Sequence, residues 1–201
     1  MLYLASSIFI LVSIWVGNAA LALFLGIILA FYKEVPKTFF TKKYGSTILQ
    51  TGIVFLGGSL SLGSFFEINS SYFLLISLFV IGAFILVLLV GKMFGVSKKL
   101  TYLLGSGTAI CGGTAIAAVG PTIKAEPEEF SAAIAIIFLL NALAVILFPI
   151  AGDFFSLSER EFGAWVALAI HDTASVLGAA SMMGDEAMEV AATLKVSRTL
   201  W

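Results

Sequence analysis

The residues best suited to bind a small solute lie in a segment of small side chains at positions 105–114. This segment carries four glycines and three hydroxyl side chains, yet it lies inside an apolar run long enough to cross a membrane. Adjacent glycines such as Gly112 and Gly113 weaken a helix by about 1 kcal/mol each relative to alanine. A break there would point free N–H groups and the positive end of a helix dipole at a bound anion. The anion-binding residues that we predict from this segment are Thr108, Cys111, Gly112, Gly113 and Thr114.

The same small residues have a second interpretation. Glycine, serine and threonine also let two transmembrane helices pack closely against each other. The segment lacks the Gly-Lys-Ser/Thr sequence of a phosphate loop and the GxGxxG sequence of a dinucleotide site. A substrate-lining break and close helix packing therefore both stay open.

His171 and Asp172 form the second candidate site. His171 is the only histidine, and both residues fall near the middle of the apolar run Phe162–Met183. An ionisable group inside a span costs a few kcal/mol, so it indicates a function such as donating to an anion or carrying a coupling proton. Neighbours on a helix point about 100° apart, so both face one site only where the helix is interrupted. The alternative is a polar pair that packs against its neighbours, which also explains Asn141 in the preceding run.

Three basic residues complete the candidate set. Lys124 precedes an acidic turn, Glu126–Glu129, and either attracts and gates the anion or forms an exposed ion pair. Lys195 and Arg198 lie three residues apart, on one face of a helix. They either line the inner mouth of a pathway or extend to the cytoplasmic surface.

The composition places these residues in a membrane protein. Hydrophobic residues make up 60% of the 201 residues, charged residues only 11%, and the mean hydropathy is +1.09. A water-soluble domain is about a quarter charged and cannot bury this much apolar surface. The net charge of −1 gives no reason to expect nucleic acid as a partner. One cysteine and one histidine are too few for common metal sites, and we expect no cofactor.

Eight apolar runs organise the chain, and they predict an all-α, polytopic transmembrane bundle with discontinuous helices in a single domain, residues 1–201. A spanning helix needs about 20 residues. The first two runs are shorter and are separated only by Gly17 and Asn18, so they form either two spans or one kinked helix. The runs are Leu2–Val16, Ala19–Tyr32, Ser46–Leu62, Ser71–Met93, Leu100–Ile123, Phe130–Ala151, Phe162–Met183 and Ala187–Trp201.

The distribution of basic residues predicts the orientation. If all eight runs span, ten lysines and arginines fall on the side of the N-terminus and only Lys124 falls on the other. Basic residues concentrate on the cytoplasmic side, so we predict a cytoplasmic N-terminus in a multi-pass protein of a bacterial inner membrane. If the first two runs form one span, only the N-terminus changes sides.

The central segment resembles the YeiH-type sulfate exporter family. The shared motifs are Gly107–Gly112, the alanine-rich stretch Ala115–Ala118, Pro121–Ala125 with its following glutamates, Ile170-His171-Asp172, Lys195 with Arg198, and Gly52–Gly57. The resemblance implies an inverted-repeat fold like that of cation/proton antiporters, and export of sulfate or a related small oxyanion. Members of that family usually continue beyond the Lys-x-x-Arg stretch, which implies that this chain is incomplete at its C-terminus.

These observations favour a secondary transporter that moves a small oxyanion by alternating access. Its expected partners are the anion, a coupling proton or cation, the lipid bilayer and, as an assembly, further copies of itself. One alternative is a cation/proton antiporter centred on Asp172, and another is a membrane fragment that does not transport. A membrane-embedded enzyme using His171 and Asp172 is disfavoured because no nucleophile or metal set accompanies them.

Overall fold

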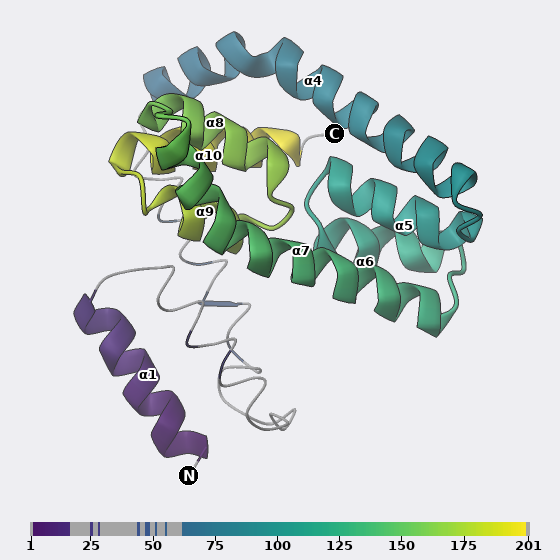
Figure 1. The fold of residues 1–201 in the computed structure, drawn as a ribbon, viewed down its shortest axis with the longest axis horizontal. Helices are drawn as coiled ribbons and strands as arrows, with labels where there is room; N and C mark the ends of the chain where they lie inside the picture. Colours follow the sequence, from purple (N-terminus) through teal and green to yellow (C-terminus); the bar gives the residue numbers. More distant parts are fainter. Residues whose placement is uncertain are drawn as a thin grey trace. The chain divides into compact units, whose positions relative to one another are not determined.

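The computed structural model describes residues 2–16 and 62–199, together with the single positions 25, 28, 44, 47, 48, 51 and 55. The chain divides into two compact units, Met1–Ser61 and Leu62–Trp201 (Figure 1). Every regular element of the described residues is a helix, which confirms the predicted all-α class. The helices are α1 (Leu2–Val16), α4 (Leu62–Met93), α5 (Lys98–Ala109), α6 (Gly113–Thr122), α7 (Pro127–Phe154), α8 (Glu159–Ala169), α9 (Thr173–Ala180) and α10 (Asp185–Arg198).

The first unit contributes one described helix. α1 has the bounds of the first predicted apolar run, and its 15 residues correspond to a length of about 22 Å. The expected runs Ala19–Tyr32 and Ser46–Leu62 fall almost entirely outside the described residues. Whether the first two runs form one span or two therefore stays a prediction.

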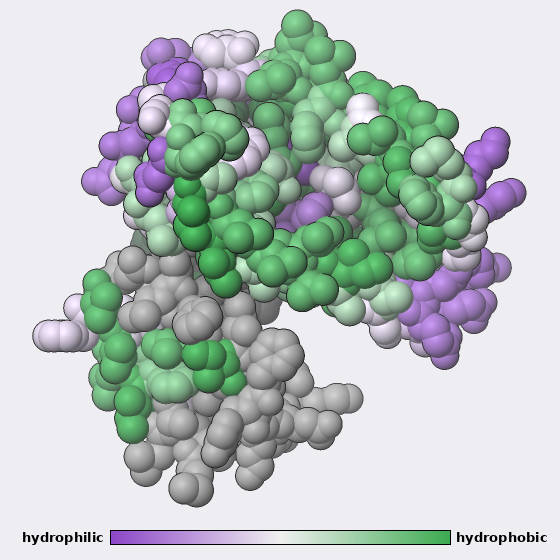
Figure 2. All heavy atoms as spheres, in the orientation of Figure 1, coloured by the Kyte–Doolittle hydropathy of each residue, from purple (hydrophilic) through white to green (hydrophobic). Residues whose placement is uncertain are grey.

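The second unit is built along two long apolar helices, α4 and α7. Their 32 and 28 residues correspond to about 48 and 42 Å, more than the roughly 30 Å of a bilayer core. Both are apolar and long enough to cross a membrane, and α4 begins well before the predicted start at Ser71. Hydrophobic atoms cover the middle of this unit, and hydrophilic atoms gather at its two ends (Figure 2). This pattern is the one a membrane-spanning unit requires.

α5 and α6 form a hairpin that enters and leaves the unit at one end. Lys99, in the first turn of α5, donates from Nζ to the carbonyl oxygen of Lys124, just after α6, at 2.6 Å. Ser97, which caps α5, donates to Glu129 at the start of α7 at 2.5 Å. α5 and α6 correspond to about 18 and 15 Å, roughly half of the bilayer core. We call this pair the first hairpin.

The first hairpin corrects two predictions. The run Leu100–Ile123 is not a single span, because its two halves run in opposite directions (Figure 1). Lys124 therefore lies at the same end of the unit as Lys99, not across the membrane from it. The glycine-rich segment predicted a break, but hydropathy alone cannot tell a broken span from a chain that turns back.

α8 and α9 form a second hairpin that enters from the opposite end. The backbone N–H of Glu186, at the start of α10, donates to the Glu159 carboxylate at the start of α8, at 3.1 Å. Arg160 forms an ion pair with Glu186 at 3.9 Å. The chain thus returns after α9 to the end where α8 began, and the run Phe162–Met183 is not a single span either. α10 then runs inward from that end (Figure 1).

The two halves of this unit are inverted copies of one motif, a long helix followed by a hairpin. The N–H groups of Phe94 and Val96 bond back to residues 90 and 91 at the end of α4, and those of Phe155 and Leu157 bond back to residues 151 and 152 at the end of α7. At these turns corresponding positions differ by 61, as in 94 and 155 or 96 and 157. Because α4 and α7 end at opposite ends of the unit, the two hairpins enter from opposite sides.

The packing of α8 against α10 depends on Gly163. A β-carbon at this position would lie 2.5 Å from the carbonyl oxygen of Ala187 and 3.0 Å from its α-carbon. We expect Gly163→Ala to destabilise the protein by about 1–3 kcal/mol, because backbone atoms cannot move aside as a side chain can. Thermal unfolding in detergent measures this. The matched control is Gly82→Ala in α4, where nothing lies within 4 Å, and a loss as large in the control would contradict the prediction.

The hairpin topology also predicts which end each loop occupies. In a Cys111→Ser background, cysteines placed at Lys98 and Lys124 are expected to react with an impermeant thiol reagent from the same side of the membrane. A cysteine at Asp153, where α7 ends, is expected to react only from the other side. Labelling of intact and permeabilised cells distinguishes the sides, and labelling of positions 98 and 124 from opposite sides would disprove the first hairpin.

Candidate functional site

The tips of the two hairpins meet beside α7. The first tip is residues 110–112 and the second is residues 170–172, where the helices are interrupted. A β-carbon on Gly112 would lie 3.3 Å from Cβ of His171 and 3.1 Å from the side chain of Ile137 in α7. The predicted break near Gly112 is confirmed, and the structure brings the two sequence candidates, the glycine segment and the His171–Asp172 pair, against each other.

At the second tip, both the C=O and the N–H of the peptide group between Ile170 and His171 have hydrogen-bond partners. Lys195 donates from Nζ to the carbonyl oxygen of Ile170 at 2.7 Å. The next N–H, that of His171, donates to Oδ1 of Asn141 at 3.0 Å. A non-helical peptide in a membrane needs such partners, because lipid offers none. Lys195 and Asn141 thus supply the hydrogen bonds that the interrupted helix lacks.

Asn141 fixes the tautomer of His171 and keeps a free donor. Its Oδ1 accepts the backbone N–H, so the amide oxygen must face the histidine. The ring Nδ1 lies 3.1 Å from the same oxygen and therefore donates, which leaves Nε2 as the atom that can gain a proton. Nδ2 of Asn141 is buried and has no partner among the described residues, although only 1% of the side chain is exposed. A buried amide without a partner is unfavourable by about 1–3 kcal/mol, so this group is suited to hold a solute atom.

The N-termini of α6 and α9, which lie at the two hairpin tips, differ in one respect. At α9 the carboxylate of Asp172 accepts the N–H of Ser175, the third helical residue, at 2.9 Å. At α6 the capping residue is Gly112, and no side chain accepts a hydrogen bond there. The third helical residue of α6, Ala115, is the counterpart of Ser175. One N-terminus thus carries its own carboxylate and the other does not.

Lys195 and Arg198 lie in the centre of the unit. Both are 0% exposed, so of the two alternatives open from the sequence, extension to the cytoplasmic surface does not hold. Neither forms an ion pair with any residue that the structure describes. Arg198 instead donates to carbonyl oxygens at the inner ends of α5 and α8.

The remaining predicted site residues separate into two groups. Thr108, Cys111, Gly113 and Thr114 all lie at or next to the first tip, with the Cys111 thiol free and half-buried. Lys124 follows the far end of α6, about 15 Å from Gly112 along the helix, and does not belong to the site. Asn141 is the residue that sequence reasoning undervalued, and its signal was a lone amide in an otherwise apolar span.

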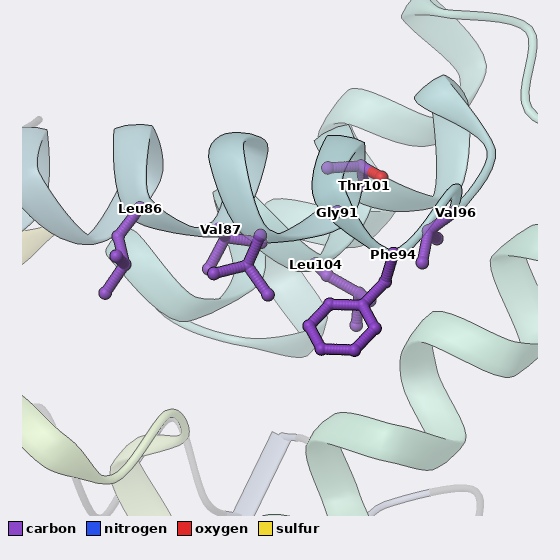
Figure 3. A pocket seen from close by; sticks show the side chains of 8 residues that line it. Leu86, Val87, Gly91, Phe94, Val96, Thr101 and Leu104 are labelled. Atoms are coloured by element: carbon purple, nitrogen blue, oxygen red, sulfur yellow. The ribbon is translucent and has the colours of Figure 1, made fainter.

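A separate cavity of about 300 Å³ lies between α4 and α5, near the end where Lys99 and Lys124 meet (Figure 3). Its one hydroxyl, on Thr101, donates to the carbonyl oxygen of Ser97. The cavity therefore offers no charged group to an anion, and it is distinct from the meeting of the tips. Its lining residues are Leu86, Val87, Val90, Gly91, Phe94, Val96, Thr101 and Leu104.

Comparison with known proteins shows a well-populated family of membrane proteins. The chain is similar to the UPF0324 membrane proteins of Bacteroides thetaiotaomicron (41% identity over 94% of this chain) and Vibrio parahaemolyticus (40% over 92%). It is also similar to that of Porphyromonas gingivalis, at 44% identity over 79% of this chain. The matches cover 57%, 59% and 49% of those relatives, so the chain spans between about half and three fifths of their length. No solved structure matches.

A family-level comparison agrees with the individual relatives. The family described as conserved hypothetical protein 698 matches residues 2–201. The relatives are named as membrane proteins, in agreement with the apolar helices α4 and α7. Because the match extends over almost the whole sequence, this chain belongs to the conserved hypothetical protein 698 family of UPF0324 membrane proteins.

Proposed function

We propose that the chain is part of a secondary transporter for a small oxyanion, which binds where the hairpin tips meet. The observation that carries the proposal is the difference between the two inner helix N-termini. The inverted repeat places α6 and α9 in equivalent positions, and the carboxylate of Asp172 occupies the N-terminus of α9. The N-terminus of α6, capped only by Gly112, offers the same N–H groups to a carboxylate-like group from outside the chain.

The charges at the centre of the unit also favour an anion. Lys195 brings one positive charge when its ammonium group is protonated, Arg198 brings another, and Asp172 brings one negative charge. These three formal charges sum to +1 when Lys195 is protonated, and the charge of Arg198 is offset by the backbone carbonyls at the ends of α5 and α8. Lys195 uses one N–H group on Ile170, so its remaining donors are available to a solute. The ammonium group of Lys195 is therefore the group that would attract an oxyanion.

Two hairpins entering from opposite ends suit alternating access. The site at their tips is separated from one side by the first hairpin and from the other side by the second. Movement of one hairpin at a time would open the site to one side only, as inverted repeats do in other transporters. Sulfate, or a related oxyanion such as sulfite, is the substrate that the resemblance to YeiH-type exporters suggests. Because relatives are longer, the complete cycle belongs to the whole protein.

A second candidate is cation/proton antiport, which rests on Asp172. Oδ2 of Asp172 is buried and has no partner among the described residues, so it can accept a proton or a cation. Together with Nε2 of His171 it would also serve an anion transporter as the coupling-proton group. The two candidates differ in whether flux requires the anion or sodium and potassium.

We also propose which end of the second unit faces the cytoplasm. The end of the second unit that contains Lys92, Lys98, Lys99 and Lys124 is expected to be cytoplasmic, since the described residues place only Arg160 at the opposite end. The relatives named above come from bacteria, which supports our proposal of a bacterial inner membrane. This orientation keeps the predicted bias of basic residues while correcting the position of Lys124.

Flux in proteoliposomes containing the protein tests the proposal. Uptake of labelled sulfate or sulfite is expected, and the same anions are expected to slow alkylation of Cys111, which precedes the open N-terminus of α6. Flux that needs sodium or potassium but no oxyanion would favour the second candidate. No flux of any solute, and no protection of Cys111 by any oxyanion, would overturn the anion site.

A further inference from the structure

All five N–H groups of the Arg198 guanidinium are used on backbone carbonyls. Nη2 donates to the carbonyls of Thr108 and Ala109, at 2.7 and 2.8 Å, and Nε also reaches Ala109 at 3.2 Å. Nη1 donates to the carbonyls of Ala167 and Leu168, both at 2.7 Å. An arginine side chain has five N–H donors and no acceptor, so none remains for a solute.

The four carbonyls belong to both hairpins. Thr108 and Ala109 are the last residues of α5, and Ala167 and Leu168 lie in the last turn of α8. Helix C-termini leave carbonyls without partners and carry about half a negative charge each. Two such ends together match one guanidinium charge, which explains how Arg198 is buried without an acidic partner. Its guanidinium also lies 5.0 Å from the centre of the Phe79 ring in α4.

We infer that Arg198 is a positioning residue that ties the inner ends of the two hairpins together and does not bind the transported solute. The planar guanidinium fork serves two carbonyl pairs at once, which a lysine ammonium with three donors cannot do. The tie fixes the first tip relative to the second, so it sets the geometry of the site where they meet. This inference stands on the contacts of Arg198 and holds whichever solute the protein moves.

The test compares Arg198→Lys with Arg160→Lys in the full-length chain in detergent. Both substitutions keep the charge, but Arg160 is partly exposed and forms only an ion pair at 3.9 Å. Cys111, the only cysteine, lies two residues after the carbonyl of Ala109 and reports on the first tip. We expect Arg198→Lys to raise the rate of Cys111 alkylation by at least about tenfold, the change that loss of one charged hydrogen bond produces. Arg160→Lys is expected to leave the rate unchanged.

Two further measurements separate positioning from binding. Hydrogen exchange in peptides spanning 105–112 and 165–171 is expected to accelerate in Arg198→Lys at both tips, while peptides from α7 stay protected. Sulfite or sulfate, where it protects Cys111 in the wild type, is expected still to protect it in Arg198→Lys, because the guanidinium has no donor left for a solute. A wild-type alkylation rate and wild-type exchange in Arg198→Lys would overturn the tie. Loss of oxyanion protection in Arg198→Lys with an unchanged alkylation rate would instead make Arg198 a ligand of the solute. Absence of protection in the wild type would contradict the proposed anion site and leave the tie unaffected.

Discussion

Replacing Gly112 with alanine is expected to reduce oxyanion transport by at least about thirtyfold, because the first tip cannot keep its backbone conformation. Gly112 has φ 59° and ψ −117°. Residues with a side chain rarely adopt this backbone conformation, which is unfavourable for them by roughly 1–2 kcal/mol. The added β-carbon would also press on Ile137 and on the His171 backbone. Together these effects amount to about 2 kcal/mol or more, which corresponds to the stated factor.

The adjacent glycine provides the control. A β-carbon on Gly113 would meet only the ring of Phe138, at 3.6 Å, which is ordinary van der Waals contact. Gly113→Ala is therefore expected to transport at close to the wild-type rate and to be slightly more stable, since alanine favours a helix. Initial rates of flux, normalised to folded protein, measure both variants. Equal losses in the two variants would contradict the assignment of the turn to Gly112.

Lys195→Met is expected to weaken oxyanion binding by about thirtyfold or more. Methionine fills a similar volume but removes the ammonium group, leaving the Ile170 carbonyl without its partner and the site without that donor. A hydrogen bond to a charged group contributes about 1.5–3 kcal/mol, and each 1.4 kcal/mol is a factor of ten in affinity. Binding is measured by the concentration of sulfite or sulfate that protects Cys111 from alkylation.

Lys124→Met is the matched control for Lys195→Met. Lys124 is exposed after the far end of α6 and lies outside the site, so its loss is expected to change the protecting concentration by less than about threefold. A stronger effect at Lys124 than at Lys195 would restore the gating role predicted from the sequence. Flux and thermal unfolding of both variants distinguish a loss of binding from a loss of folding.

The sequence predicted the breaks better than the path of the chain. The glycines of segment 105–114 and the mid-span pair His171–Asp172 both mark places where helices stop, and the structure has interruptions at both. Glycine residues indicate where a helix is weakened, but they do not determine the direction of the helix that follows. That direction depends on contacts between distant residues, such as Lys99 with Lys124, which no local pattern contains.

The burial of Lys195 and Arg198 was unpredictable for a related reason. Two basic residues on one face of an end helix normally extend toward water. Here they are buried because unpaired carbonyls of α5 and α8 reach the same place, and those carbonyls exist only once two hairpins have formed. The available signal was the internal repeat, since Gly91, Phe94 and Ser97 recur 61 positions later as Gly152, Phe155 and Ser158. This recurrence marks the start of each hairpin.

The similar depth of the two hairpins has an electrical consequence. Their helices correspond to about 12 to 18 Å, so a solute between the tips would lie near the midpoint of the roughly 30 Å insulating layer. An ion entering from either side would then cross about half of the membrane voltage, or roughly 1.2 kcal/mol per charge for each 100 mV. Release to the other side would cross the remaining half. Membrane potential would therefore act on both steps of an anion's passage to a similar extent, and neither gate alone would carry the voltage dependence.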